Sequence, residues 1–278
     1  LELMDNTVKT NYDIERNSLT VLGVIPSIGE DESKNTIKLL GIYKWLVGEK
    51  SSKINLKRRL ITKEDPRSPV SEAYRSLRTS MLYTGIDKEI KSILVSSAGP
   101  GEGKTTTVAN MAITYANLGK KTLLIDTDLR RPVVHKIMNL DKEPGITNYL
   151  AGNIKNFNEL IKKTDIDNLF SVTSGIIPPN PSELLGSKKM GELVKSLEKD
   201  WDMVLFDSPP LVAVTDATMV SKEIDNIVIV VKVGQTDKKA FEHTIQSLRN
   251  VNAPIGGVVL NAVTHKNSYG SYYYYYQY

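Results

Sequence analysis

The sequence contains no cysteine among its 278 residues. Disulfide bonds, thiol nucleophiles and cysteine metal sites are therefore excluded, and the composition fits a reducing compartment. Long apolar runs are also missing, because no stretch approaches the roughly 18 to 20 residues of a membrane span and no signal peptide opens the chain. We expect a cytosolic polypeptide. Since the sequence begins at Leu1 rather than at methionine, we also expect a fragment of a longer protein.

The chain has little excess charge of either sign. It contains 36 Lys and Arg against 32 Asp and Glu, which gives a formal net charge of +4. This mild balance does not indicate the electrostatic footprint of a nucleic-acid-binding protein, so we expect no nucleic acid partner. The three histidines have no metal-ligand spacing. The function must therefore be inferred from residues other than a basic surface or a histidine metal site.

From about residue 90 the sequence alternates short apolar runs with helical stretches. Several runs are apolar almost throughout, as buried parallel strands are. With 40% hydrophobic residues, the chain can bury the core of one large domain. The pattern predicts an α/β fold of three layers, with a mostly parallel central sheet flanked by helices and a ligand at the carboxyl ends of the strands. The expected strands are residues 91–98, 121–128, 168–175, 203–210, 226–234 and 255–263.

The first of these strands leads into a glycine-rich loop. The segment AGPGEGKTTT, residues 98–107, lies between that strand and a strong helix pattern. In such a loop backbone N–H groups surround phosphate oxygens, Lys104 reaches the β and γ phosphates, and the Thr105 hydroxyl can ligate Mg²⁺. Ala98 replaces the usual first glycine of the G-x-x-x-x-G-K-[ST] pattern and is small enough to leave the loop geometry intact. The predicted cofactor-binding residues of this P-loop are Gly99, Gly101, Glu102, Gly103, Lys104, Thr105 and Thr106.

Three aspartates lie at the ends of two other expected strands. Asp126 and Asp128 are two residues apart in LLIDTDLRRP, so on an extended backbone they share a face. Asp207 ends the run MVLFD at a Walker-B-like position. A lone aspartate at a strand end is most often a cap or turn residue. Three of them beside a phosphate loop repel one another unless a divalent cation lies among them, which favours Mg²⁺.

Four segments together resemble the bacterial tyrosine kinases, the BY-kinases of capsule and exopolysaccharide export. SAGPGEGKTTT, LLIDTDLRRP, GIIPPNPSELLGS and VLFDSPP are similar, in this order, to their Walker A, Walker A′, proline-rich and Walker B segments. The likeness covers residues from about 60 to 278, and the combination of motifs is highly specific. It implies a P-loop fold and an ATP-dependent protein tyrosine kinase. The H-R-D and D-F-G motifs of eukaryotic protein kinases are missing from the sequence.

The resemblance also implies a division of the chain into three parts. VLGVIPSI is similar to the cytoplasmic end of CapA-type membrane modulators. Residues 1–50 are therefore expected to be a modulator-like activator segment and linker, residues 51–265 the kinase domain, and residues 266–278 a tyrosine-rich tail. The implied partners are a transmembrane modulator, a cognate tyrosine phosphatase and exogenous polysaccharide-synthesis enzymes as substrates. The implied location is the inner face of the cell membrane, reached through the modulator.

Site residues follow from the same resemblance. Lys104 and the loop amides would hold ATP, with Mg²⁺ held by Thr105, Asp128 and Asp207. An acceptor phenol has a reference pKa of about 10 and needs a base, for which Asp126 is the family's candidate, although one sequence does not divide the roles of Asp126 and Asp128. Lys104, Asp126 and Asp128 are the expected catalytic residues.

Three further residues have two possible roles each. Asn261, which ends GGVVLN, occupies the position where related proteins contact the base of the nucleotide, but it could as easily cap a turn. Arg130 and Arg131 follow Asp128 closely. They either steady phosphate charge or pair with surface carboxylates.

The tail and one helix indicate assembly. Glu72, Arg75 and Arg78 recur every third residue along SEAYRSLRTSM, which by default is a solvated charged face. The resemblance implies that this spacing makes contacts between subunits of a ring. A loosely tethered tail reaches a neighbour's active site in such a ring, and added phosphates repel one another. We expect autophosphorylation in trans, followed by disassembly, at Tyr269, Tyr272, Tyr273, Tyr274, Tyr275, Tyr276 and Tyr278.

Two other functions remain open. A MinD/ParA-like ATPase shares the fold and the paired aspartates, but it spends ATP on dimerisation and localisation. That group has an extra lysine where this sequence has Gly99, and it has no tyrosine tail. The second alternative is a non-enzymatic scaffold, in which ATP is a structural ligand and the tail is an adhesive segment.

Overall fold

The computed structural model describes residues 5–27, 60–84, 89–212 and 216–264. The predicted acceptor tyrosines and most of the predicted linker lie outside these residues. Among the described residues no helix has the length and apolar character that crossing a bilayer requires.

The described residues form an eight-stranded sheet in the order β1-β8-β7-β2-β6-β3-β5-β4. Every pairing is parallel except that of β4 with β5, which is antiparallel. The six expected strands are all confirmed as members of this sheet. The strands are β1 Val21–Pro26, β2 Ser92–Ser97, β3 Thr122–Asp126, β4 Lys162–Lys163, β5 Leu169–Val172, β6 Met203–Asp207, β7 Asn226–Lys232 and β8 Ile255–Val263.

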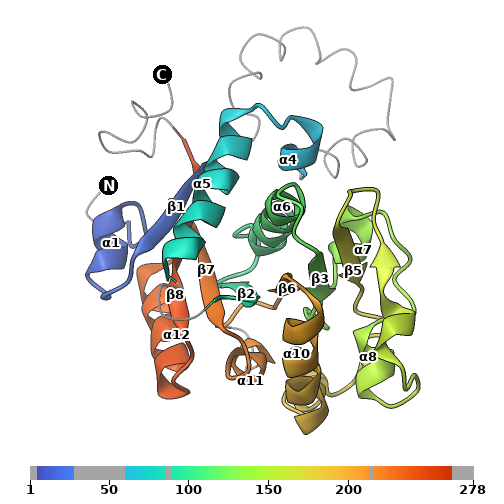
Figure 1. Cartoon of the computed structure of the whole chain (residues 1–278). Coiled ribbons are helices and arrows are strands. Elements are labelled where there is room, and N and C mark those ends of the chain that lie inside the picture. Colours follow the sequence, from blue (N-terminus) through green and yellow to red (C-terminus); the bar gives the residue numbers. More distant parts are fainter. Residues whose placement is uncertain (1–4, 28–59, 85–88, 213–215, 265–278) are drawn as a thin grey trace, which may run out of the picture.

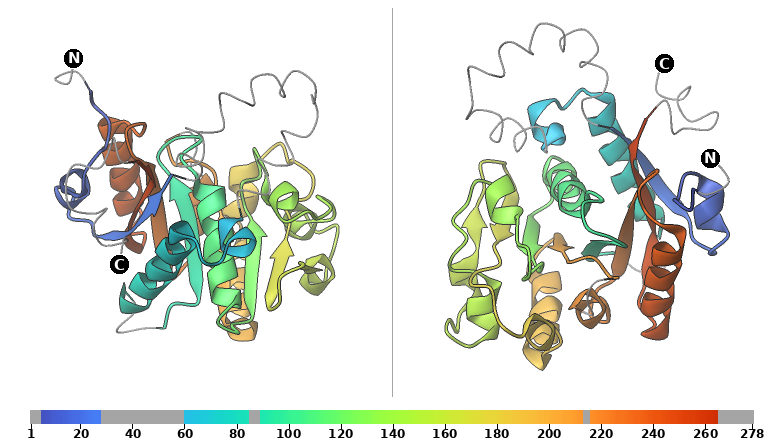
Figure 2. Two further views of the ribbon diagram at one scale, coloured as in Figure 1. Left: turned by 90° about the horizontal axis from the view of Figure 1, so that it is seen from above. Right: turned by 180° about the vertical axis from the view of Figure 1, so that it is seen from behind.

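Helices cover both faces of the sheet (Figure 1), as the predicted three-layer fold requires. Two further views show the same arrangement from above and from behind (Figure 2). The helices are α1 Asn11–Glu15, α4 Ile61–Glu64, α5 Pro69–Thr84, α6 Lys104–Ala116, α7 Val134–Ile137, α8 Ile146–Leu150, the 3₁₀ helix η2 Phe157–Leu160, α9 Pro181–Leu185, α10 Lys188–Asp200, α11 Asp216–Ser221 and α12 Lys238–Asn250.

The two faces of the sheet build two separate parts of the core. Side chains alternate along a strand, so Leu123 and Ile125 of β3 pack into the core beneath α10, α11 and α12, whereas Leu124 packs into the core beneath α5 and α6. Because both faces are covered, the strands are apolar almost throughout, with β2, β3 and β6 buried along their whole length. Asp126 and Asp207, at the carboxyl ends of β3 and β6, are the buried carboxylates of these strands.

The N-terminal residues belong to the same sheet. β1 is an edge strand that pairs in parallel with β8, for example Val21 with Val258. The short helix α1, which precedes it, is fixed by Asp13, whose carboxylate accepts the N–H groups of Lys9 and Thr10 at 3.0 and 3.1 Å. The same carboxylate lies 2.7 Å from the ammonium group of Lys238 at the start of α12. Residues 5–27 are thus tied to the sheet, and the domain boundaries drawn from the sequence stay a prediction.

Candidate functional site

The candidate site lies at the carboxyl ends of β2, β3 and β6, in the middle of the sheet. β6 lies between β2 and β3, and Asp126 is in register with Asp207 across the β3–β6 pair. The glycine-rich loop begins directly after β2 and ends where α6 starts at Lys104. Three segments far apart in sequence therefore meet at one edge, as the parallel-sheet rule predicts.

The loop has a backbone that requires glycine at two positions. Gly101 has φ +77° and Gly103 has φ +99°, a region that L-residues rarely adopt. At Gly103 a side chain would also find no space, because an added Cβ would lie 2.1 Å from the amide nitrogen of Asn261. Gly103 is the N-cap of α6, so the first N–H groups of a 13-residue helix face the mouth of the loop. Such an N-terminus favours anions.

Lys104, Thr105, Asp128 and Asp207 meet at this mouth. Lys104 Nζ lies 2.8 Å from Asp128 Oδ2 and 3.6 Å from Asp207 Oδ1. The Thr105 hydroxyl donates to Asp207 Oδ2 at 2.7 Å. One ammonium group thus lies between two carboxylates that the chain brings in from different strands. These are four of the residues that the sequence singled out.

Asp126 lies near this group, but its carboxylate is bonded to the backbone. Its carboxylate is fully buried, and it accepts the N–H groups of Asp128 at 3.2 Å and Val134 at 3.1 Å. Burial raises the pKa of Asp126 well above its ordinary value, and the charges of Asp207 and Asp128 act in the same direction. Asp126 therefore fixes the turn after β3, and its predicted catalytic role stays a prediction.

The electrostatics of the cluster follow from burial and from charge. Burial raises the pKa of Asp207 to about 6, although Lys104 and the Thr105 hydroxyl favour its ionised form. Burial acts to lower the pKa of Lys104, but the carboxylates of Asp207 and Asp128 outweigh it and raise the value. Lys104 is therefore held in its charged form at neutral pH.

The donor set fits a divalent cation. Asp207 Oδ1 is buried and has no hydrogen-bond partner among the described residues, and the Thr105 hydroxyl lies beside the same carboxylate. Oxygen donors of this kind are what Mg²⁺ takes from proteins. In the described part of the chain, no group of three His, Cys, Asp or Glu side chains is arranged to hold a metal ion. The predicted magnesium site of Thr105, Asp128 and Asp207 combines one hydroxyl with two carboxylates, and it stays a prediction.

The remaining loop residues have structural contacts. Glu102 is 4% exposed, and its carboxylate accepts the hydroxyl of Thr236 at 2.7 Å. Asn261, at the end of β8, donates to the backbone oxygen of Glu102 at 2.8 Å. The backbone oxygen of Thr106 accepts the side-chain amide of Asn110 at 2.8 Å. Asn261 is thus placed against the loop, and its predicted contact with the nucleotide base is not tested.

Arg130 has a partner that the sequence did not indicate. Its guanidinium group donates from Nε to Asp216 Oδ2 at 2.7 Å and from an Nη to Oδ1 at 3.2 Å. Asp216 is fully buried at the start of α11, and it also accepts the hydroxyl of Ser182 in α9. The pair connects the turn after β3 to the segments that follow β5 and β6. Asp216 lies in no motif, so only the three-dimensional contact reveals it. Arg131 is an exposed residue.

The predicted subunit-interface residues lie on α5. Arg75 forms an ion pair with Glu72 at 2.6 Å, and both side chains are substantially exposed. Arg78 donates to the backbone oxygen of Thr114 in α6 at 2.7 Å, while its Nε is buried without a partner in the described residues. Two of the three side chains thus face solvent, and their role in assembly is not tested.

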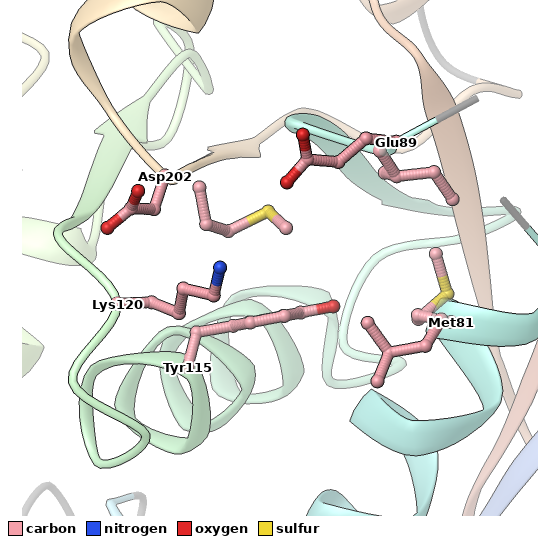
Figure 3. Close-up of a pocket in the computed structure, with 8 residues that line it drawn as sticks. Met81, Glu89, Tyr115, Lys120 and Asp202 are labelled. Carbon is pink, nitrogen blue, oxygen red and sulfur yellow. The ribbon is translucent and has the colours of Figure 1, made fainter.

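A hollow lies apart from the candidate site, and Figure 3 shows residues that line it. It has a volume of about 300 Å³ and is lined by Met81, Tyr115, Lys120 and Asp202 among others. Lys120 and Asp202 directly precede β3 and β6, so this hollow lies at the amino ends of the strands. It contains none of the predicted site residues.

The comparisons with known proteins agree with this geometry. Residues 90–255 match the family model described as AAA domain. The chain is 38% identical over 219 residues to the tyrosine-protein kinase YwqD of Bacillus subtilis, and the match covers 78% of this chain and 92% of YwqD. The crystal structure of the chimerical protein CapA2B2 superposes with a TM-score of 0.77 at 32% identity, covering 92% of this chain and 99% of that one. The Pyrococcus horikoshii septum site-determining protein MinD, solved with Mg-ADP, shares the fold at 23% identity and a TM-score of 0.54, over 62% of this chain and 70% of that one.

Proposed function

Because this chain belongs to the bacterial tyrosine kinase family, we propose that it transfers the γ-phosphoryl group of ATP to the tyrosines of its own C-terminal tail. One observation carries the proposal. Lys104, Thr105, Asp128 and Asp207 meet at the mouth of a glycine-rich loop, on a chain whose last ten residues include seven tyrosines. Regulation of capsular or exopolysaccharide synthesis and export is part of the same proposal.

In this proposal the phosphates of ATP bind to the loop amides and to the N-terminus of α6. Lys104 then exchanges the carboxylate of Asp128 for phosphate oxygens. The exchange is feasible because the ion pair is accessible to solvent, with the Lys104 side chain 12% exposed. Phosphoryl transfer needs mainly positioning and charge neutralisation, which these groups supply. Asn261 is the proposed neighbour of the base.

Thr105, Asp128 and Asp207 are the proposed holders of Mg²⁺. When bound, the ion supplies positive charge to the phosphoryl oxygens. The buried Asp207 Oδ1, which has no hydrogen-bond partner in the described part of the chain, supports this assignment. Asp126 and Asp128 are the candidate bases for the acceptor phenol. Asp128 lies beside Lys104 in the mouth of the site, whereas the carboxylate of Asp126 accepts two backbone N–H groups.

We further propose that transfer occurs in trans within a ring of subunits. Glu72, Arg75 and Arg78 would contribute to the contacts between them, and phosphorylated tails would be expelled. Other proposed partners are a transmembrane modulator that brings the chain to the inner face of the membrane, a cognate phosphatase and polysaccharide-synthesis enzymes as substrates.

A mixing experiment tests transfer between chains. The first chain carries Lys104→Met with its tail intact, and the second has a normal site but phenylalanine at all seven tail tyrosines. We expect phosphotyrosine to appear on the first chain only when the second is present with Mg·ATP. If the mixture gives none, while the unaltered chain phosphorylates itself, the transfer is within one chain.

A second candidate function is an ATPase that uses ATP for dimerisation and localisation. The shared fold with MinD favours it, although that likeness shows the fold alone. This alternative predicts phosphate release and nucleotide-dependent dimers without phosphotyrosine. Sizing chromatography with ATP and with ADP, read beside phosphotyrosine content, separates the two.

A further inference from the structure

The turn between β7 and α12 contains a buried threonine that touches the glycine-rich loop. Thr236 is 1% exposed, and its hydroxyl donates to Glu102 Oε1 at 2.7 Å. Nothing in the motifs points to this residue, because it lies 134 positions from Glu102 in the sequence. The contact nevertheless joins the phosphate-binding loop to a different part of the fold.

Glu102 is placed to shape the loop rather than to meet phosphate. A carboxylate directed at phosphate oxygens would repel them, but this one is buried on the inner side of the loop. Burial raises the pKa of Glu102, and the Thr236 hydroxyl and the N–H groups of Gly99 and Ala98 offset part of that effect. Oε1 accepts from Thr236, whereas Oε2 is buried with no hydrogen-bond partner among the described residues. The Thr236 hydroxyl is thus the side-chain group that holds Glu102, beside the backbone N–H groups of Gly99 and Ala98.

Every polar atom of Thr236, in its hydroxyl and in its backbone, forms a hydrogen bond. Its hydroxyl accepts the N–H of Lys232 at 2.9 Å while it donates to Glu102, and its own N–H donates to the backbone oxygen of Lys232 at 3.0 Å. Its backbone oxygen accepts the N–H of Val8 at 2.8 Å. A hydroxyl has one hydrogen to donate, so the bond from Lys232 leaves it free to point only at Glu102. The threonine is therefore in a fixed geometry.

The backbone of the N-terminal segment holds this turn from the other side. Val8, fully buried, also accepts the N–H of Gly234 at 2.9 Å, and the backbone oxygen of Asn6 accepts the N–H of Lys238 at 2.8 Å. These bonds make a short ladder between residues 6–8 and residues 234–238. The turn is thus pinned between the N-terminal segment and the loop.

We propose that Thr236 is a positioning residue for nucleotide binding, which holds Glu102 and through it the curvature of the glycine-rich loop. The inference rests on the proposed function, in which the loop amides bind the phosphates of ATP. Without the hydroxyl, Oε1 of Glu102 loses its side-chain partner, and the side chain turns toward water or toward the phosphate site. Either movement changes the direction of the loop N–H groups. Thr236 acts only through Glu102, so it is not a catalytic residue.

Two substitutions at this position separate the hydroxyl from the packing. Thr236→Val keeps the shape and removes the hydroxyl, whereas Thr236→Ser keeps the hydroxyl. The matched control is Thr244→Val, because Thr244 is equally buried but its hydroxyl donates within α12 to the backbone oxygen of Ala240 at 2.9 Å. Equilibrium binding of a fluorescent ADP with Mg²⁺ should be about tenfold weaker for Thr236→Val, and within about twofold of the unaltered chain for the other two. Kinase assays should show a higher KM for ATP and a kcat within about threefold.

A second measurement does not use nucleotide. Amide hydrogen exchange of residues 98–103 in the free protein should be faster in Thr236→Val than in Thr236→Ser or Thr244→Val. Unchanged exchange and unchanged affinity in Thr236→Val would overturn the proposal. A loss of thermal stability equal to that of Thr244→Val, with affinity retained, would also overturn it and leave Thr236 a structural residue. If the unaltered chain forms no phosphotyrosine, the proposed function fails, while the exchange measurement still decides the role of Thr236.

Discussion

The ammonium nitrogen of Lys104 lies 2.8 Å from the carboxylate of Asp128. The lysine of the glycine-rich loop is therefore paired with a carboxylate of the chain. If Lys104 binds phosphate, as proposed, nucleotide must compete with Asp128 for its charge. Asp128 thus gives the largely buried Lys104 a counter-ion at the mouth of the loop.

Asp128→Asn separates the two roles assigned to this carboxylate. The change removes the competitor for Lys104, so we expect metal-free ADP to bind as tightly as before or more tightly. Phosphotyrosine formation should fall by about 100-fold or more, because charge stabilisation of the transferred group is lost. Calorimetry and phosphotyrosine assays measure the two effects. Exposed Asp167→Asn is the control, and weaker ADP binding in Asp128→Asn would contradict the competition.

Arg130→Ala tests the connection between the turn after β3 and α11. The substitution removes the two-point ion pair of the buried Asp216 carboxylate and leaves its hydrogen bond from the Ser182 hydroxyl. Because Arg130 itself is 44% exposed, we expect a loss of about 1–3 kcal/mol in the free energy of unfolding, which is smaller than the loss for a fully buried ion pair. Denaturant unfolding measures it. Arg131→Ala, at an exposed side chain, should stay within about 0.5 kcal/mol, and equal losses in both would refute the assignment.

Gly103→Ala tests the fit between the loop and β8. The added methyl group meets the amide nitrogen of Asn261 and also sits on a backbone with φ +99°. We expect nucleotide affinity to fall by about tenfold or more. Gly103→Ala with Asn261→Ala should recover part of it, since the clash is removed while the backbone strain of about 1–2 kcal/mol and the loss of the Asn261 side chain remain. The control is Gly119→Ala, where φ is +80° but an added Cβ meets nothing within 4 Å. It should lower stability without changing affinity.

The N-terminal segment should respond to acid through Asp13. Burial acts to raise the pKa of Asp13, but the ion pair with Lys238 and the N–H groups of Lys9 and Thr10 outweigh it and hold the value below the ordinary 3.8. The folded state thus binds this proton less readily than the unfolded state. The stability that the group supplies is full above the ordinary value and is lost as the pH falls through the folded-state pKa.

Asp13→Asn checks this direction. Near neutral pH it should lower the free energy of unfolding by about 1–2 kcal/mol, because a cap and an ion pair are lost. The difference from the unaltered chain should shrink below about pH 4. Thermal unfolding at a series of pH values follows it, and a difference that stays constant down to pH 2 would show that the charge is not the cause.

The sequence predicted the sheet because both of its faces are buried. Six apolar runs that alternate with helical stretches are typical of strands of a covered parallel sheet, and all six are found. The convergence of Lys104, Asp128 and Asp207 followed from the same rule, since carboxyl ends of parallel strands share an edge.

Contacts between distant segments were not predictable in this way. The pairing of β1 with β8 joins residues more than 230 positions apart, and neither strand alone specifies its neighbour. The partners of Arg130 and Glu102 are a buried aspartate and a buried threonine outside any motif. The family resemblance implies a catalytic role for Asp126, which stays a prediction, but no motif revealed that its carboxylate accepts the N–H groups of Asp128 and Val134. Side-chain direction at a turn depends on local backbone bonds that no residue pattern records.

Mass spectrometry of the C-terminal peptide after incubation with Mg·ATP tests the central claim most directly. The unaltered chain should carry phosphate on tail tyrosines, and Lys104→Met, whose ammonium group is gone, should carry none. An unaltered chain that consumes ATP and leaves every tail tyrosine unmodified would contradict the account, as would phosphotyrosine that persists in Lys104→Met.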